Sequence, residues 1–158
     1  MKHQLALTFL AEPTDVNFGG KVHGGMVMKW IDQAGYACAV GWSKAYCVTV
    51  YVGGIRFLKP IFIGDLVEVR CKIIYTGTSS MHIAIDVFSR SPKSEEWTRN
   101  THCIVVFVAV DENGKPTSVP NWQPQTENEK QMEHYAQRLM ELRKGIETEM
   151  EAFWGIED

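Results

Sequence analysis

The 158-residue sequence shows neither the hydropathy pattern of a membrane-spanning segment nor that of a signal segment. No stretch approaches the roughly 20 uninterrupted apolar residues that cross a bilayer. The N-terminus shows no basic segment followed by an apolar run and a cleavage site, so we expect a cytoplasmic location. The formal net charge is −3 and the basic residues form no long run. These features argue against nucleic acid or an anionic membrane surface as a partner.

Cysteine and histidine do not occur here in the spacings that zinc sites and redox motifs require. There is no His-rich cluster and no set of carboxylates at ligand spacing, so we expect neither a metal site nor a bound cofactor. Each cysteine sits inside an apolar segment, far from the others, which indicates reduced thiols in a protein core. The four are Cys38, Cys47, Cys71 and Cys103.

The composition is that of an ordinary globular protein. Hydrophobic residues make up 45% and charged residues 22% of the chain, which excludes disordered and fibrous classes. The length suits one domain with a sizeable core and is too short for two ordinary domains. We therefore expect one folding unit with an appendage.

One long segment is apolar nearly all round. Residues 25 to 40 have the length of a helix rather than a strand, and such a helix must be covered by other structure. Its few polar side chains recur at helical spacing and so form one narrow stripe. They are Lys29, Asp32, Gln33 and Tyr36.

The remaining pattern up to residue 110 has a period of two, which indicates strands. Residues 66 to 75 alternate charged and apolar side chains, as in an antiparallel strand with one wet face. Further strands are expected at residues 4 to 10, 46 to 57, 81 to 89 and 97 to 110. The order of strand, helix and four strands with short connections predicts an antiparallel sheet curled around one helix, an α+β fold.

The end of the chain differs from the rest. From Glu127 to Phe153 it is charged and helix-prone, with apolar residues spaced by threes and fours. We therefore predict two parts. Residues 1–122 form the domain, and residues 123–158 form a linker and an amphipathic helix that needs a surface to cover.

Several short motifs, in order, resemble one known family. Residues 15–25 (DVNFGGKVHGG) and 30–35 (WIDQAG) look like the start of acyl-CoA hydrolases of the brain-type and bacterial YciA-type branch. Later parts of that branch are resembled by residues 48–52, 57–60, 64–67, 77–80, and 108–111 with 114–116, so the resemblance covers about residues 4 to 122. It implies the hotdog fold, with about five antiparallel strands around a central helix, and acyl-CoA thioesterase activity.

Thioester hydrolysis needs an activated water and a polarised carbonyl. Asp32 on the long helix is the candidate base, and partial burial there would strengthen it. Asn17 is the candidate that orients the water or the carbonyl. Gly24 and Gly25 stand where the helix begins, so their unpaired N–H groups suit a developing oxyanion. Without the resemblance, Asp32 could equally well be an ion-pair partner of Lys29. For Asn17, an Asn before Gly-Gly favours a turn residue over a catalytic one.

Binding coenzyme A requires cations for its phosphates and donors for its pantetheine arm. The candidate contacts are Arg56, Lys59, Arg90 and His23, together with the turn residues Gly77, Thr78, Ser79 and Ser80. Each cation also reads as a solvated charge at the end of a strand. Phe18, Met26, Trp30 and Tyr36 are candidates for the walls of the acyl pocket.

In relatives of this type the Asp and the Asn of one site come from different subunits. The resemblance therefore implies a homo-oligomer, at least a dimer and commonly a trimer of dimers, acting on acyl-CoA. One alternative is a non-catalytic hotdog module that binds acyl-CoA and docks a partner through its tail helix. A hotdog enoyl-CoA hydratase is disfavoured because such enzymes carry paired Asp and His at the helix start, a motif not found here.

Overall fold

The computed structural model describes residues 2–157, which form two units. One unit extends to Trp122 and the other begins at Gln123. The second unit consists of a short extended segment and the helix α2 (Glu127–Glu157). The first contains β1 (Gln4–Leu10), the 3-10 turn η1 (Pro13–Asp15), α1 (Gly24–Ser43), β2 (Tyr46–Phe57), β3 (Leu66–Thr76), β4 (Ser80–Arg90) and β5 (Thr98–Val110).

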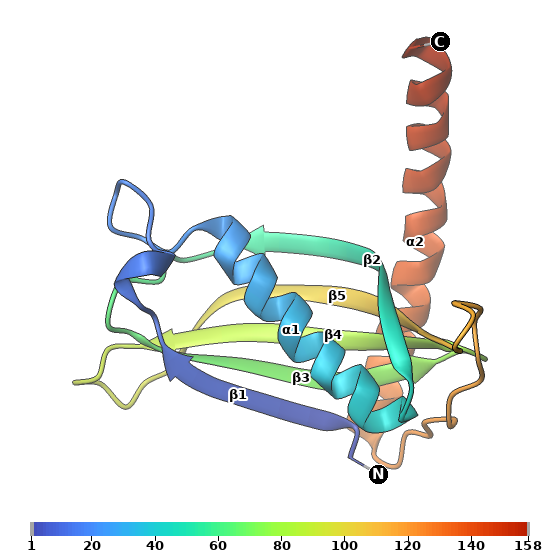
Figure 1. Cartoon of the computed structure of the whole chain (residues 1–158), viewed down its shortest axis with the longest axis horizontal. Coiled ribbons are helices and arrows are strands. Elements are labelled where there is room, and N and C mark those ends of the chain that lie inside the picture. Colours follow the sequence, from blue (N-terminus) through green and yellow to red (C-terminus); the bar gives the residue numbers. More distant parts are fainter. Residues whose placement is uncertain (1, 158) are drawn as a thin grey trace. The chain divides into compact units, whose positions relative to one another are not determined.

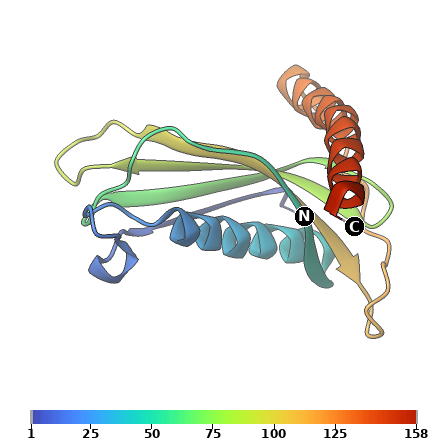
Figure 2. The ribbon, with the colours of Figure 1, turned by 90° about the horizontal axis from the view of Figure 1, so that it is seen from above.

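The five strands form one antiparallel sheet in the order β1-β3-β4-β5-β2, and α1 lies along one face of it (Figures 1 and 2). Consecutive strands β3, β4 and β5 are neighbours, whereas β1 and β2 form the two edges. This is the hotdog arrangement, so the predicted fold is confirmed.

The alternation along β3 explains which face of the sheet receives the helix. Val67, Val69 and Ile73 are fully buried. Arg70 and Lys72, between them, point to the other face and stay partly exposed. Burial of such apolar strand faces against one helix supplies most of the domain's stabilisation. The predicted wet and dry faces of this strand are therefore confirmed.

Gly35 lets α1 approach the sheet closely. A Cβ atom added there would lie 2.8 Å from the Phe107 ring and 2.9 Å from the Ile85 side chain, so a larger residue would push the helix outward. The helix runs longer than predicted at both ends. It stops at Lys44, whose φ of 56° is left-handed and whose N–H bonds to the Val40 carbonyl.

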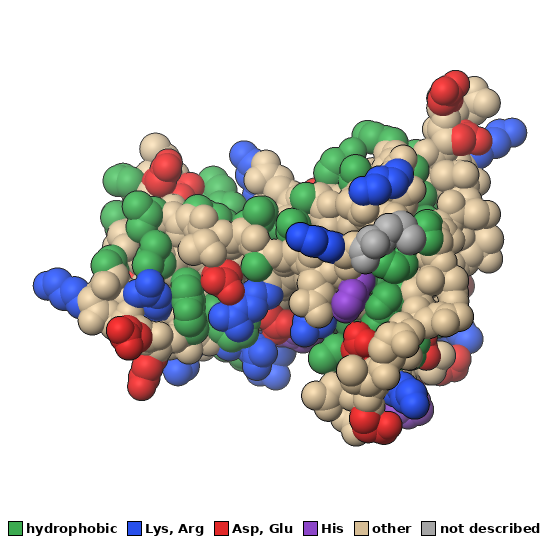
Figure 3. All heavy atoms as spheres, turned by 90° about the horizontal axis from the view of Figure 1, so that it is seen from below, with side chains coloured by type: hydrophobic (Ala, Val, Ile, Leu, Met, Phe, Trp, Pro, Cys, Tyr) green, Lys and Arg blue, Asp and Glu red, His purple; other side chains and the backbone are tan. Residues whose placement is uncertain are grey.

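The four cysteines are free and buried, as predicted. Burial raises the pKa of the Cys38 and Cys103 thiols to about 12, and it raises the pKa of Cys71 as well. These thiols stay protonated at neutral pH and are poor nucleophiles. On the face shown in Figure 3, basic and acidic side chains are interspersed with apolar ones rather than gathered into a patch of one sign.

Candidate active site

Asp32 lies on the exposed side of α1. All four polar residues of the predicted stripe are exposed in the single chain. The expected partial burial of Asp32 is therefore wrong for one chain, because α1 buries only its opposite side, from Val27 to Trp42. Within residues 2–157, no ion pair joins Asp32 to Lys29.

The hydroxyl of Thr49 holds the Asp32 carboxylate. Thr49 Oγ1 donates a hydrogen bond of 2.6 Å to Asp32 Oδ1, across 17 residues of chain. Thr49 lies in β2 beside an irregularity of the β2–β5 pairing, where the register slips between Thr49 and Tyr51. Hydrogen bonds to a charged acceptor are short and strong, so this contact orients the carboxylate. The sequence offers no sign of this contact, because Thr49 lies within the predicted strand at residues 46 to 57 and far from Asp32 in the chain.

A small apolar cavity adjoins Asp32. Its volume is about 190 Å³, and Asp32 is its one polar lining residue. The other walls come from α1, β2 and β5, and consist of Met28, Ile31, Val52, Ile55 and Val105. None of the four wall residues suggested by the sequence lines it. Phe18 is fully exposed, while Met26 and Trp30 pack against the core.

Asn17 shapes the loop before α1 and keeps two donors for other use. Its Oδ1 accepts hydrogen bonds from the N–H groups of Gly19 (2.9 Å) and Lys21 (3.3 Å). Gly20 has a φ of +77°, which the tight loop requires. The side-chain Nδ2 donors of Asn17 have no acceptor among the described residues. The Asn17 side chain can therefore shape the turn through Oδ1 and still donate hydrogen bonds through Nδ2.

The first turn of α1 presents unpaired backbone amides. His23 occupies the N-cap position without a side-chain cap, and its carbonyl accepts from Met26 N and Val27 N. The N–H groups of Gly24 and Gly25 find no acceptor within the described part of the chain. Gly24 packs against Phe57, whose ring would be 3.3 Å from an added Cβ. An anion at this end would meet free N–H groups and the positive end of the helix dipole.

Asn17 and Gly24 line a common cavity of about 360 Å³. Lys59 also lines it, with Phe57, Pro60 and the strand residues Asn100 and Thr101. The buried Asn100 fixes this wall, because its Nδ2 donates to the carbonyls of Lys59 and Pro60, both at 3.2 Å. Asp32 does not line this cavity. One chain therefore brings Asn17, Gly24 and Lys59 together and keeps Asp32 at a separate cavity.

The turn at residues 77–80 lies at the opposite end of the sheet from the loop that precedes α1 (Figure 1). Ser80 pairs with Val108 of β5, whereas the Asn17 cavity meets the same strand at Asn100 and Thr101. At about 3.3 Å per residue, the two places are roughly 25 Å apart. The carbonyls of Thr78 and Ser79 accept from Val119 N and Ala109 N, both at 2.9 Å, which fixes the turn.

The remaining predicted coenzyme A contacts differ in their surroundings. Arg56 is exposed on β2, and its guanidinium makes no hydrogen bond or ion pair with another described residue. Arg90 already has partners within the chain. Its Nη1 donates a hydrogen bond of 2.6 Å to the Ser94 carbonyl, and its guanidinium lies over the Trp97 ring. His23 is exposed, and its backbone joins η1 through a bond to the Asp15 carbonyl.

A polar cluster on β4 and β5 lies outside both cavities. Asp86 Oδ1 accepts from His102 Nδ1 at 2.9 Å and from Arg99 Nε at 3.1 Å. Burial alone would raise the pKa of the Asp86 carboxyl, but the hydrogen bonds and charges of these two partners outweigh it and lower the pKa. His102 lies in β5 and is a partner of Asp86 across the sheet.

No group of three or more His, Cys, Asp or Glu side chains within residues 2–157 is arranged to hold a metal ion. Neither α1 nor α2 combines the length and the apolar character that a membrane-crossing helix needs.

Comparison with known proteins places these features in a family. The model of the thioesterase superfamily matches residues 19–96. Protein VdlD of Helicobacter pylori is 35% identical over 140 residues, covering 89% of this chain and 80% of VdlD. The acyl-CoA thioester hydrolase YciA of Salmonella typhimurium is 35% identical over 120 residues, covering 74% of this chain and 90% of YciA.

Solved structures of acyl-CoA hydrolases and thioesterases are also similar to this chain. The acyl-CoA hydrolase of Bacillus cereus superposes with a TM-score of 0.89 at 28% identity, covering 98% of this chain and 94% of that one. The acyl-CoA hydrolase of Staphylococcus aureus, solved with butyryl coenzyme A and coenzyme A, gives 0.86 at 28% identity, covering 95% and 92%. A hexameric thioesterase of Yersinia pestis gives 0.70 at 37% identity, covering 73% and 94%. The chain therefore belongs to the thioesterase superfamily, in the hotdog-fold group that includes the acyl-CoA thioester hydrolases.

Proposed function

We propose that this protein hydrolyses the thioester of acyl-CoA to a carboxylic acid and coenzyme A, in sites shared between two copies of the chain. The observation that carries this proposal is the division of the site residues. Asp32 faces one cavity, and Asn17 with Gly24 faces another. A site with both a base and an oxyanion pocket needs one cavity from each of two protomers. Similarity to YciA and to the coenzyme A-bound hydrolase supports the substrate class.

The strand β2 offers the edge through which two protomers would pair. It is 12 residues long, ends the sheet, and exposes Tyr46 (64%), Val50 (54%) and Phe57 (54%). A long apolar edge strand with unpaired backbone groups is rarely left open in a monomer. Pairing of two β2 strands would bury these side chains and bring Thr49 and Asp32 of one copy towards the other. The hexameric Yersinia thioesterase supports a higher assembly of such dimers, a hexamer.

In the proposed reaction Asp32 acts as the general base. It takes a proton from water, the water oxygen bonds to the thioester carbon, and the carbonyl oxygen becomes an oxyanion. The N–H groups of Gly24 and Gly25, with the Nδ2 donors of Asn17, stabilise that oxyanion. The tetrahedral intermediate then collapses, the C–S bond breaks, and the proton held by Asp32 neutralises the departing thiolate. Thr49 keeps the carboxylate oriented throughout.

Substituted forms of the Staphylococcus hydrolase support these roles. Its solved variants replace an asparagine, an aspartate and a threonine by alanine. Those three positions are separated by 15 and 17 residues, as are Asn17, Asp32 and Thr49 in this chain. The same three residue types at the same separations make the correspondence specific.

The acyl chain and the coenzyme A part of the substrate would bind in different surroundings. The apolar cavity beside Asp32 suits the first carbons of an uncharged acyl chain, because burying a charge there would be costly. Lys59 beside Asn17 and the exposed Arg56 suit the phosphates of coenzyme A. The turn at residues 77–80 serves a site only if it belongs to another protomer than the Asn17 of that site. Four reduced thiols fit a reducing compartment, and we place the protein in the cytoplasm.

The test is release of free thiol from a panel of acyl-CoA esters that vary in chain length and charge. Asp32→Asn should lower kcat by about 100-fold or more, the usual range for losing a general base, while coenzyme A affinity stays near that of the wild type. Glu112→Gln, an exposed carboxylate beyond β5, is the control and should behave as wild type.

Two outcomes of this assay would contradict the proposal. Equal kcat in wild type and Asp32→Asn would remove Asp32 from the chemistry. Tight acyl-CoA binding without thiol release from any ester would instead favour the alternative, a binding module without catalysis.

A further inference from the structure

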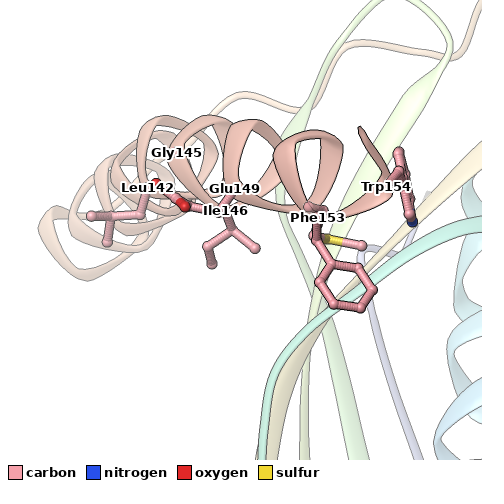
Figure 4. Close-up of a pocket in the computed structure, with 7 residues that line it drawn as sticks. Leu142, Gly145, Ile146, Glu149, Phe153 and Trp154 are labelled. Atoms are coloured by element: carbon pink, nitrogen blue, oxygen red, sulfur yellow. The ribbon is translucent and has the colours of Figure 1, made fainter. Parts of the chain in front are cut away.

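The C-terminal half of α2 carries an apolar stripe, formed by Leu142, Ile146, Met150 and Phe153. Their separations of four, four and three residues place them on one side of the helix. Figure 4 shows Leu142, Ile146 and Phe153 projecting to the same side. All four are exposed, at 66%, 54%, 48% and 56% respectively. A hollow of about 520 Å³ runs between them, bordered also by Gly145, Glu149 and Trp154.

Such a stripe is costly in water and indicates an interface. Scattered exposed apolar residues are normal, but a continuous row along a helix marks a surface that another element covers. Trp154 and Ile156 extend it, with exposed fractions of 54% and 81%. The matched region of the Bacillus hydrolase covers 98% of this chain and so includes nearly all of α2.

The charges of α2 favour a second copy of the same helix as the partner, in antiparallel orientation. From Gly145 onward the helix contains four glutamates and no basic residue. Residues 127–144 carry four cations, Lys130, Arg138, Arg143 and Lys144, together with four glutamates, so this part of the helix is close to neutral. A parallel pair would place the acidic halves side by side, where like charges repel. An antiparallel pair instead places each acidic half beside the mixed half that carries the cations.

The stripe also fits itself in this orientation. With Ile146 of the two copies opposite each other, Leu142 of one copy meets Met150 of the other, and Leu139 meets Phe153. Glu149 then lies opposite Arg143 of the second copy. A Cβ atom added at Gly145 would meet no atom within 4 Å, so the helix backbone is uncovered there and another helix has room to approach. An isologous contact of this kind closes on itself and suits an oligomer with twofold axes.

We propose that the apolar stripe of α2 packs antiparallel against the same stripe of a second copy, so that α2 is an oligomerisation element of this protein. This goes beyond the proposed hydrolysis and does not depend on that reaction, but it rests on the proposed pairing of copies through the domain. Two such stripes bury less than the roughly 1,600 Å² of a standard interface. The contact therefore reinforces copies already held together through the domain, where the effective concentration is high.

Disulfide trapping in the full-length chain tests the pairing and its direction. Leu142→Cys and Met150→Cys variants carrying different tags are mixed, dissociated, reassociated and mildly oxidised. The native cysteines are buried, so their background is low. An antiparallel pair gives the mixed 142–150 disulfide in at least tenfold excess over either homodisulfide. Thr148→Cys, on the opposite side of α2, is the control and should give no disulfide.

Other trapping results would overturn the proposal. Homodisulfides of Leu142→Cys in excess over the mixed product would show a parallel pair. Absence of any disulfide, with both thiols shielded from alkylation in the oligomer, would show that the stripe is covered by something other than a second α2.

A charge in the stripe gives an independent measurement. Ile146→Glu should raise the protein concentration at which the oligomer half-dissociates by about tenfold or more, because two copies each lose an apolar contact. Analytical ultracentrifugation measures this shift, and circular dichroism checks that the fold is kept. Thr148→Glu serves as the matched control. Equal dissociation of the two variants would contradict a role for the stripe.

Discussion

At the scale of single residues, Thr49 explains how an exposed carboxylate keeps one orientation. Asp32 projects from the outer side of α1, where an unrestrained side chain would sample several rotamers. The 2.6 Å hydrogen bond from Thr49 Oγ1 removes that freedom. A base that must meet water beside a carbonyl gains from being held in place before the substrate arrives.

Thr49→Val should therefore slow hydrolysis without harming the fold. The change keeps the side-chain shape and deletes the donor, so we expect kcat to fall by roughly 10-fold to 100-fold, in line with a hydrogen bond to a charged group. Thr49→Ser, which retains the hydroxyl, should keep most of the activity. Steady-state kinetics on one acyl-CoA ester measures both, and an equal loss in the two variants would point to packing instead of the hydrogen bond.

Sequence reasoning proposed Asn17 and Asp32 as site residues but not Thr49, for a physical reason. Asn17 and Asp32 stand in contiguous stretches whose residues can be compared directly with a family. Thr49 acts through a contact between a helix and a strand, and that contact depends on where the β2–β5 register slips. Nor could the exposure of Asp32 be predicted, because the apolar character of residues 25 to 40 suggested cover all round.

At the scale of elements, the two edges of the sheet are unequal. β1 has 7 residues and β2 has 12, and the edge formed by β2 bears more exposed apolar side chains. Periodicity could predict these strands and the wet face of β3, because each strand has one buried side. It could not predict the sheet order β1-β3-β4-β5-β2, which is set by tertiary packing. The amphipathic pattern of α2 could likewise be predicted from the sequence, but the surface against which the helix packs could not.

A charge on the β2 edge should separate the protomers. Val50 falls at the register slip and is exposed, so Val50→Lys is tolerated within one chain but places a cation where two β2 strands would meet. We expect the molar mass from light scattering to drop and hydrolysis to be lost, although Asn17 and Asp32 are intact. Leu7→Lys adds the same charge to the β1 edge and should leave both unchanged. The reverse result would assign the dimer contact to β1.

At the scale of the whole molecule, the proposed activity depends on the assembly of at least two copies. In the proposed mechanism, a single chain has the candidate oxyanion pocket at one cavity and the candidate base, Asp32, at another. Pairing of two copies would complete two sites, because a twofold-symmetric contact occurs in both directions between the copies. Activity is then a property of the oligomer, and dissociation by dilution should abolish it together with the shared cavities.

Subunit mixing is the most direct measurement of this claim. Asn17→Ala and Asp32→Asn chains, each inactive alone, are mixed in equal amounts, dissociated and reassociated. If each site takes Asn17 and Asp32 from different copies, half of the dimers are mixed and each has one intact site. Thiol release should then recover to about a quarter of the wild-type rate per site. A mixture no more active than its two parents would show that both residues serve from the same chain, which would contradict the shared site.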